Sequence, residues 1–171
     1  RVLDDGDRGL VAVIVRRPHF LLQRRIKPGD PYEGYWELPG GKMRRGETAR
    51  LALEREIREE AGMKLDTVLG QPEVALTDRF GRTASLLTPL VTVEISSGPW
   101  PFLGLYFACE ASGDPCATDE GGHHRWVTPT AFSREFLEQS GNEGAESLCT
   151  TLDLLALRAI LSEGSGLRIV T

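Results

Sequence analysis

The sequence predicts an α/β fold in which helices pack against a mixed β-sheet. Short apolar runs rich in β-branched residues stand on both sides of one early helical stretch, and further helical patterns follow near the end of the chain. With 171 residues, of which 40% are hydrophobic, the chain is long enough to bury a sizeable core. We therefore expect residues 1–171 to form a single domain.

The first elements are expected to be short strands. Residues 9–16 (GLVAVIVR) and 20–25 (FLLQRR) have strand character, and YWEL at 35–38 is a third candidate. Two prolines, two glycines and an aspartate predict a loop over 26–34, and PGG after YWEL predicts a turn.

A helix is expected over residues 49–61. Thr48 is a suitable N-cap, only good helix formers follow, and Gly62 is a suitable C-cap. Because each residue of a helix rotates by about 100°, the apolar residues of this stretch form one arc. Three carboxylates share a flank beside that arc: Glu56, Glu59 and Glu60.

Three apolar or alternating stretches after this helix predict strands at 67–76, 84–95 and 102–111. A polar loop is expected over 112–124, then a short strand at 125–129. Helical spacing predicts helices at 130–139 and 145–163. The last helix is apolar over a wide arc, which suits packing on its own sheet and leaves a homodimer open as an alternative.

Charge and composition exclude several classes of protein. The formal net charge of −5 argues against binding of a nucleic acid polymer, which relies on a basic surface. No apolar run approaches the ~20 residues of a membrane span and no signal pattern is present, so we expect no membrane contact and a cytoplasmic location. Three cysteines without paired spacing predict neither disulfides nor a zinc site, and we expect them to be buried.

The crowded glutamates need an explanation, since like charges at i and i+4 destabilise a helix by a few tenths of a kcal/mol. A solvated acidic face is the ordinary explanation of such a run. Here, however, the glutamates border the apolar arc and follow a glycine-rich loop. Mg²⁺ binds through one or two carboxylates together with substrate phosphates, so this arrangement favours metal-assisted phosphate chemistry.

The stretch 41–63 resembles the Nudix hydrolase signature, G-x5-E-x7-R-E-U-x-E-E-x-G-U, where U is a bulky aliphatic residue. All nine fixed positions match: Gly41, Glu47, Arg55, Glu56, Ile57, Glu59, Glu60, Gly62 and Met63. The flanking YWELPGGK and LLQRR also resemble the family. The resemblance implies an α/β/α sandwich with a mixed sheet. It also implies Mg²⁺-dependent cleavage, with Mn²⁺ as a substitute, inside the pyrophosphate of a nucleoside diphosphate derivative.

The resemblance also assigns metal ligands by position. Glu56 and Glu60 would bind Mg²⁺ directly, helped by the carbonyl oxygen of Gly40. Glu59 would be a further ligand or would bind the metal through water.

Catalytic roles follow in the same way. Arg55 would orient Glu47 through a charge-assisted hydrogen bond. Glu120 resembles the additional glutamate that some members bring from a distant loop, although Asp119 could serve instead. As the base that accepts a proton from water, Glu120 and Glu59 are the candidates, in that order.

The substrate is less well defined by the sequence. The proline near position 79 that marks hydrolases of ADP-ribose, and the tyrosine near 80 that marks those of diadenosine polyphosphates, are replaced by Arg79 and Phe80. We expect ADP-ribose or another nucleoside diphosphate sugar, with nucleoside triphosphates as the alternative. A catalytically silent nucleotide-sensing module is a third possibility, against which the complete set of signature residues argues.

Several side chains are candidates for substrate contact. Arginine and lysine could hold phosphates, and Trp36 could stack on a base or pack in the core. The basic candidates are Arg24, Arg25, Lys42, Arg44 and Arg79. For His123 and His124 a solvated loop is the default, and for Trp100 and Phe102, in the GPWPF segment, packing under a sheet edge is favoured.

Overall fold

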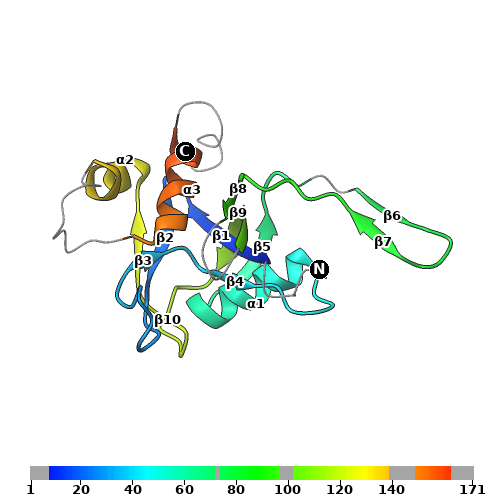
Figure 1. Ribbon diagram of the computed structural model, residues 1–171, viewed down its shortest axis with the longest axis horizontal. Helices are drawn as coiled ribbons and strands as arrows, with labels where there is room; N and C mark the ends of the chain where they lie inside the picture. Colours follow the sequence, from blue (N-terminus) through cyan, green and yellow to red (C-terminus); the bar gives the residue numbers. More distant parts are fainter. Residues whose placement is uncertain (1–7, 72–73, 97–101, 139–148, 163–171) are drawn as a thin grey trace.

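The computed structural model describes residues 8–71, 74–96, 102–138 and 149–162, and it confirms the α/β/α sandwich with a mixed sheet (Figure 1). The path through the main sheet is β10–β2–β1–β9–β5, with β3 beside β2, β4 beside β1 and β8 beside β9. β1 and β9 run parallel, and the other pairs are antiparallel. The strands are β1 (Arg8–Arg16), β2 (His19–Arg25), β3 (Trp36–Glu37), β4 (Gly40–Lys42), β5 (Lys64–Val68), β8 (Val91–Ile95), β9 (Phe102–Ser112) and β10 (Gly121–Val127).

The central strand β1 separates two hydrophobic cores. Successive side chains of a strand point to opposite faces, so an uninterrupted apolar run suits a strand that is covered on both sides. Val11, Val13 and Val15 face one core, whereas Leu10 and Ile14 belong to the other.

The helix α1 (Ala49–Ala61) covers one face of the sheet and has the bounds that the sequence predicts. The Thr48 hydroxyl accepts a hydrogen bond from the backbone N–H of Leu51, and Gly62 ends the helix in the left-handed conformation with φ +65°. Leu53 and Ile57 are buried against the sheet, which leaves the acidic flank of α1 at the edge of this contact.

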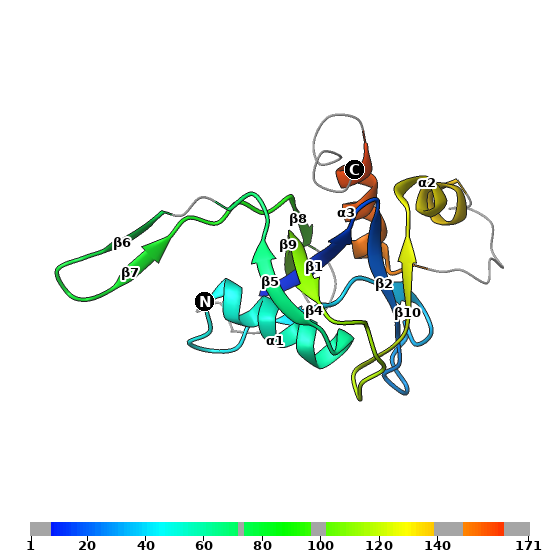
Figure 2. The ribbon, with the colours of Figure 1, turned by 180° about the vertical axis from the view of Figure 1, so that it is seen from behind.

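The opposite face is covered by the C-terminal helices, α2 (Pro129–Phe132) with the π-turn η2 (Ser133–Leu137), and α3 (Thr151–Leu161) (Figures 1 and 2). Asp153 of α3 is buried and joins three elements. It accepts hydrogen bonds from the Leu38 backbone N–H at 2.9 Å, the Tyr106 hydroxyl at 2.8 Å and the Thr150 hydroxyl at 2.9 Å. The N-terminal end of α3 is thereby held against the segment that leads into β4.

Some predicted bounds were wrong for local reasons. The strand expected at 67–76 ends at Val68, because Gly70 adopts φ +67° in a turn, and the chain forms β6 (Ala75–Thr77) only afterwards. The strand expected at 84–95 is divided into β7 (Thr83–Ser85) and β8, with Pro89, which lacks a backbone N–H, in the gap.

Other expectations also needed correction. The turn expected at PGG is in part a strand, since β4 pairs with β1. The polar loop expected over 112–124 ends at residue 120, because β10 pairs with β2 from Gly121 on. The helix expected at 130–139 begins at Pro129 and passes into η2. The helix expected at 145–163 is α3, which begins at Thr151. The Thr150 N–H donates to the Trp36 carbonyl oxygen, and residues 145–148 lie outside the described part. Of the cysteines, only Cys109 is fully buried, Cys149 is half-buried and Cys116 is exposed.

The strands β6 and β7 form a separate hairpin that projects from the body between β5 and β8 (Figures 1 and 2). All six of its strand residues are exposed. Among the described residues, no helix combines the length and the apolar character that crossing a bilayer would require.

Candidate metal and nucleotide site

A cleft of about 720 Å³ lies where the acidic flank of α1 meets β4, the end of β2 and the loop before β10. One wall is acidic, because Glu56, Glu59 and Glu60 all line the cleft, and Glu120 lines it from the loop before β10. Arg25 and Lys27 line the same cleft near the end of β2, and Lys42 and Arg44 line it at β4 and the loop that follows. Residues far apart in the chain thus enclose one polar space.

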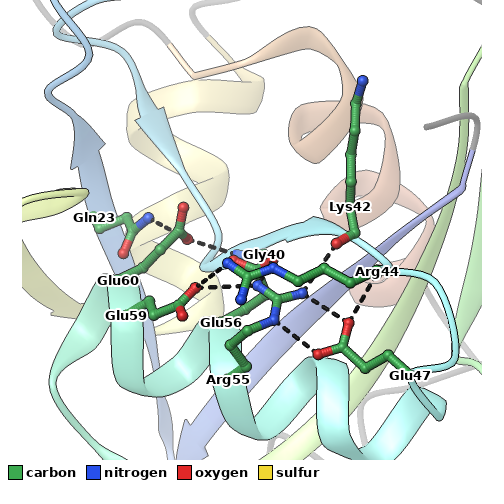
Figure 3. Close-up of polar contacts among 9 residues, drawn as sticks. All are labelled: Gln23, Gly40, Lys42, Arg44, Glu47, Arg55, Glu56, Glu59 and Glu60. Carbon is green, nitrogen blue, oxygen red and sulfur yellow. Dashed lines mark hydrogen bonds and ion pairs between the residues drawn. The ribbon is translucent and has the colours of Figure 1, made fainter. Parts of the chain in front are cut away.

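Arg55 stands at the centre of this wall, and its guanidinium binds Glu47 with two parallel hydrogen bonds (Figure 3). Nε lies 2.8 Å from one carboxylate oxygen of Glu47, and Nη2 lies 2.9 Å from the other. Nη2 also donates to the Lys42 carbonyl oxygen at 3.0 Å, and Glu47 accepts from the Arg44 backbone N–H at 2.9 Å. Hydrogen bonding to Arg55 lowers the pKa of Glu47 to about 2, so Glu47 stays ionised across the neutral range.

The remaining nitrogen of Arg55, Nη1, contacts two more glutamates. It donates to Glu56 and, at 3.1 Å, to Glu59, which also receives a 3.2 Å hydrogen bond from Arg44 (Figure 3). Burial nevertheless raises the pKa of Glu56 above its ordinary value. Arg55 thus offsets the charges of Glu56 and Glu59, and Arg44 adds a second contact to Glu59.

Glu60 is buried like Glu56 but has different partners. Its Oε2 accepts hydrogen bonds from Gln23 Nε2 and from the Gly40 backbone N–H, both at 2.7 Å (Figure 3). Burial raises the pKa of Glu60 to about 8, and the nearby Glu37 contributes by charge repulsion. At neutral pH the metal-free protein therefore holds Glu60 mainly in its protonated form.

Two glycines let backbone segments approach the acidic flank closely. A Cβ atom on Gly41 would lie 2.5 Å from Glu56 Oε1, so any side chain here would displace that carboxylate. A Cβ atom on Gly121 would collide with the Glu60 carbonyl oxygen. Glycine at position 41 is thus required by the close approach of β4 to the Glu56 carboxylate.

Sequence reasoning missed three polar residues of this site: Gln23, Lys27 and Glu37. Gln23 is fully buried in β2 and contacts Glu60, and Glu37 is buried in β3, lines the cleft and lies 3.2 Å from Arg25 Nη1. Burial raises the pKa of Glu37 to about 7. The available signal was the position of Gln23 and Glu37 directly beside apolar residues of short predicted strands, because a buried polar side chain needs a partner.

Three of the predicted substrate contacts lie elsewhere. Trp36 is 8% exposed and packs in the core beneath Arg24, whose guanidinium carbon lies 5.0 Å from the ring centroid. Arg79 lies in the turn of the β6–β7 hairpin and stacks on Phe80 at 4.7 Å. None of these three residues lines the cleft, so none is placed to contact a substrate bound there.

The histidines and the aromatic segment have other positions. The His124 ring nitrogen Nε2 lies 3.0 Å from the Glu60 carbonyl oxygen, and burial lowers the pKa of His124. His123 is exposed and adopts φ +51°. Phe102 lies in β9 with its ring against Gly9, whereas Trp100 lies outside the described residues.

The carboxylates of Glu56, Glu59 and Glu60 suit a hard cation, although their oxygens accept hydrogen bonds from other groups. Across the described residues, no three histidine, cysteine or acidic side chains are already gathered around one point as metal ligands. Glu56 and Glu59 instead face Arg55, and Glu60 faces two N–H donors. Carboxylate oxygens are nevertheless the ligands that Mg²⁺ and Mn²⁺ prefer, and those of Glu56, Glu59 and Glu60 line one cleft. The residues present therefore fit a divalent cation by their chemistry.

Comparison with known proteins gives a consistent family assignment. A model of the NUDIX domain matches residues 7–148. A putative 8-oxo-dGTP diphosphatase 2 of Mycobacterium tuberculosis is 39% identical over 77 residues, which cover 45% of this chain and 50% of the relative. A CTP pyrophosphohydrolase of Escherichia coli is 42% identical over 55 residues, covering 32% of this chain and 40% of the relative. The chain thus spans half or less of the length of these relatives.

The fold has solved counterparts as well. The crystal structure of a MutT NUDIX hydrolase from Burkholderia pseudomallei superposes with a TM-score of 0.62 at 22% sequence identity. The superposition covers 91% of this chain and 98% of that protein, so the similarity extends over nearly the whole fold.

Proposed function

Because the chain belongs to the NUDIX domain family, we propose that it is a divalent-metal-dependent hydrolase that cleaves the pyrophosphate linkage of a small nucleotide. The observation that carries the proposal is the cleft itself. Three glutamates of α1 line it together with Arg25, Lys42 and Arg44. A polyphosphate requires both features, a metal to neutralise its oxygens and cations to hold its ends.

Nucleoside triphosphates are the substrate class that we now favour. The relatives named above are a diphosphatase of 8-oxo-dGTP and a pyrophosphohydrolase of CTP, and both names describe triphosphate substrates. The sequence alone favoured ADP-ribose or another nucleoside diphosphate sugar. These compounds are therefore the competing substrate class. Trp36 packs in the core, so it is not placed to stack on the base of a nucleotide.

The residues of the cleft have distinct proposed roles. Glu56 and Glu60 bind the metal, with Glu59 as a further ligand. A bound divalent ion would lower the pKa of a coordinated water so that hydroxide is available to attack phosphorus. The proton from this water would be accepted by Glu120, which is exposed and lines the cleft, or by Glu59.

Arg55 and Glu47 form the support behind this wall. The two parallel hydrogen bonds hold the guanidinium in one orientation, and its third nitrogen then faces Glu56 and Glu59. Glu56 and Glu59 would then be available to hold a divalent cation, while the pair with Glu47 keeps Arg55 in its orientation. Arg55 is therefore a positioning residue in this proposal.

A substrate panel with product analysis tests the proposal. The panel contains common and oxidised nucleoside triphosphates, ADP-ribose and nucleoside diphosphate sugars, each with Mg²⁺, and the products are separated by chromatography. We expect a nucleoside monophosphate and pyrophosphate from triphosphates. Turnover of ADP-ribose or of the sugars alone would contradict the triphosphate proposal, and nucleotide binding without any turnover would favour a silent sensing module.

Variants test the proposed metal ligands in the same assay. Glu56→Gln and Glu60→Gln should each lower kcat at least ~100-fold, a loss of about 2.7 kcal/mol of transition-state stabilisation, without loss of the fold. Glu54→Gln is the matched control, since Glu54 lies on the same helix but does not line the cleft. Near-normal turnover by both cleft variants would refute the assignment.

A further inference from the structure

The β6–β7 hairpin has one apolar face that nothing in the described chain covers. Of the eight large hydrophobic side chains that are exposed in the described part, five lie between positions 74 and 87. Leu76 is 74% exposed and Phe80 69%, whereas residues of this kind in the body are mostly buried. The exposed apolar surface is therefore concentrated on the hairpin.

The register of the hairpin puts the apolar residues on one side. Leu76 pairs with Ala84, and the Leu86 N–H donates to the Val74 carbonyl oxygen at 3.1 Å, so these four side chains point to the same face. Val74 is 49% exposed and Leu86 57%. The four residues Val74, Leu76, Ala84 and Leu86 are called the apolar face below.

The opposite face is small and polar. Thr77 pairs with Thr83, with their hydroxyl oxygens 2.9 Å apart, and Ala75 pairs with Ser85. This alternation over 74–77 and 83–86 is typical of an antiparallel ribbon with one face buried and the other in water. The hairpin is therefore patterned for burial of a face that the described residues leave open.

A two-stranded hairpin on its own is at best marginally stable in water. Figures 1 and 2 show this hairpin extending away from the sheet and from α1, which carries the acidic wall of the cleft, so it does not cover its own site. A covering partner would supply the burial that a third strand or a second sheet normally provides.

We propose that the apolar face of the β6–β7 hairpin is a homodimer interface, in which the hairpins of two copies of this chain pack face to face across a two-fold axis. A two-fold axis brings the same patch of both copies together, so the patch must be self-complementary. The apolar face meets this condition because it contains no charged side chain that would oppose its own copy.

The charges of the hairpin lie at its tip, where they would stay outside such an interface. Asp78 binds Arg82 at 2.7 Å, and Arg79 stacks on Phe80. With two arginines and one aspartate, the tip carries one net positive charge, and it lies beyond the apolar face.

The area suits a dimer of modest affinity. The three large side chains of the apolar face, at roughly 100 Å² each, together with Ala84 and the backbone, would bury on the order of 400 Å² per copy. The total of about 800 Å² is in the size range of weak, reversible interfaces, so we expect a dissociation constant in the micromolar range. The interface is separate from the cleft and does not depend on the proposed hydrolase activity.

Sedimentation velocity over roughly 2–200 µM protein tests the proposal. The wild-type chain should pass from monomer to dimer in this range, with or without Mg²⁺. Leu76→Asp should raise the dissociation constant at least ~10-fold, because it buries an unpaired charge in the interface. Ser85→Asp introduces the same charge on the opposite face of the same hairpin and should change the constant less than about twofold.

Circular dichroism and the activity of Leu76→Asp should match those of the wild type, because Leu76 is exposed in the single chain and far from the cleft. A wild-type chain that stays monomeric at 200 µM would overturn the proposal. Equal weakening by Leu76→Asp and Ser85→Asp would overturn it as well. A monomer that binds vesicles of phosphatidylcholine and phosphatidylglycerol through Leu76 would assign the face to lipid instead.

Discussion

Replacing Glu60 with glutamine should stabilise the metal-free protein at alkaline pH while removing a metal ligand. Burial raises the pKa of Glu60 to about 8, against an ordinary value of 4.5. Between these values the folded state holds a proton that the unfolded chain releases, so the free energy of unfolding falls as the pH rises through this window. Glutamine is always neutral, and its oxygen can accept from Gln23 and Gly40 as Glu60 does.

The size of the effect follows from the pKa. At about 1.4 kcal/mol per pKa unit, the wild type should lose about 3 kcal/mol relative to Glu60→Gln between pH 5.5 and pH 8. Glu37, whose pKa burial raises to about 7, titrates in the same window and repels Glu60, so the two proteins are compared in a Glu37→Gln background, where the difference between the curves reports Glu60.

Urea unfolding in EDTA, followed by circular dichroism at several pH values, measures this difference. Glu54→Gln removes the same charge from the same helix outside the cleft and should follow the wild type. Parallel curves for the wild type and Glu60→Gln over the whole range would show that Glu60 is ionised in the folded protein and would refute the reasoning.

Further predictions concern the support of the cleft and its occupation. Gly41→Ala should weaken Mn²⁺ binding at least ~10-fold, as measured by electron paramagnetic resonance, because the new methyl group would meet Glu56 Oε1 and displace its carboxylate. Asp153→Ala should lower the free energy of unfolding in urea by about 3 kcal/mol, since the Leu38 N–H and the Tyr106 hydroxyl lose their acceptor, whereas Asp153→Asn keeps an acceptor and should cost less than half as much. Mg²⁺ at 100 times its dissociation constant should raise the free energy of unfolding by about 2.7 kcal/mol, and EDTA should reverse the rise. A melting temperature that changes with neither Mg²⁺ nor EDTA would show that the α1 glutamates are ordinary surface residues and bind no metal.

Local signals made the helix at the site predictable. The bounds of α1 follow from Thr48, from an uninterrupted run of helix formers and from Gly62, all of which act within a few residues. The position of the acidic flank then follows from helical geometry alone. The strands needed more, because Gly70 and Pro89 interrupt two apolar stretches that read as continuous.

Tertiary contacts explain what could not be read from the sequence. Glu37 lines the cleft and Gln23 contacts Glu60 behind it because β2 and β3 lie side by side there, a pairing that no local pattern specifies. Trp36 and Arg79 have suitable chemistry for a nucleotide, but the first packs in the core and the second lies on a projecting hairpin. Residue type predicts what a side chain can do, whereas its position in the fold decides whether it meets the substrate.

Binding of Mn²⁺ without substrate, followed by electron paramagnetic resonance, tests most directly whether the glutamates of α1 form a metal site. We predict that the wild type and Glu54→Gln bind Mn²⁺ equally, and that Glu56→Gln binds it at least ~10-fold more weakly, because Glu56 lines the cleft and Glu54 does not. Equal binding by all three proteins would contradict the account, since the acidic flank of α1 would then not hold the metal.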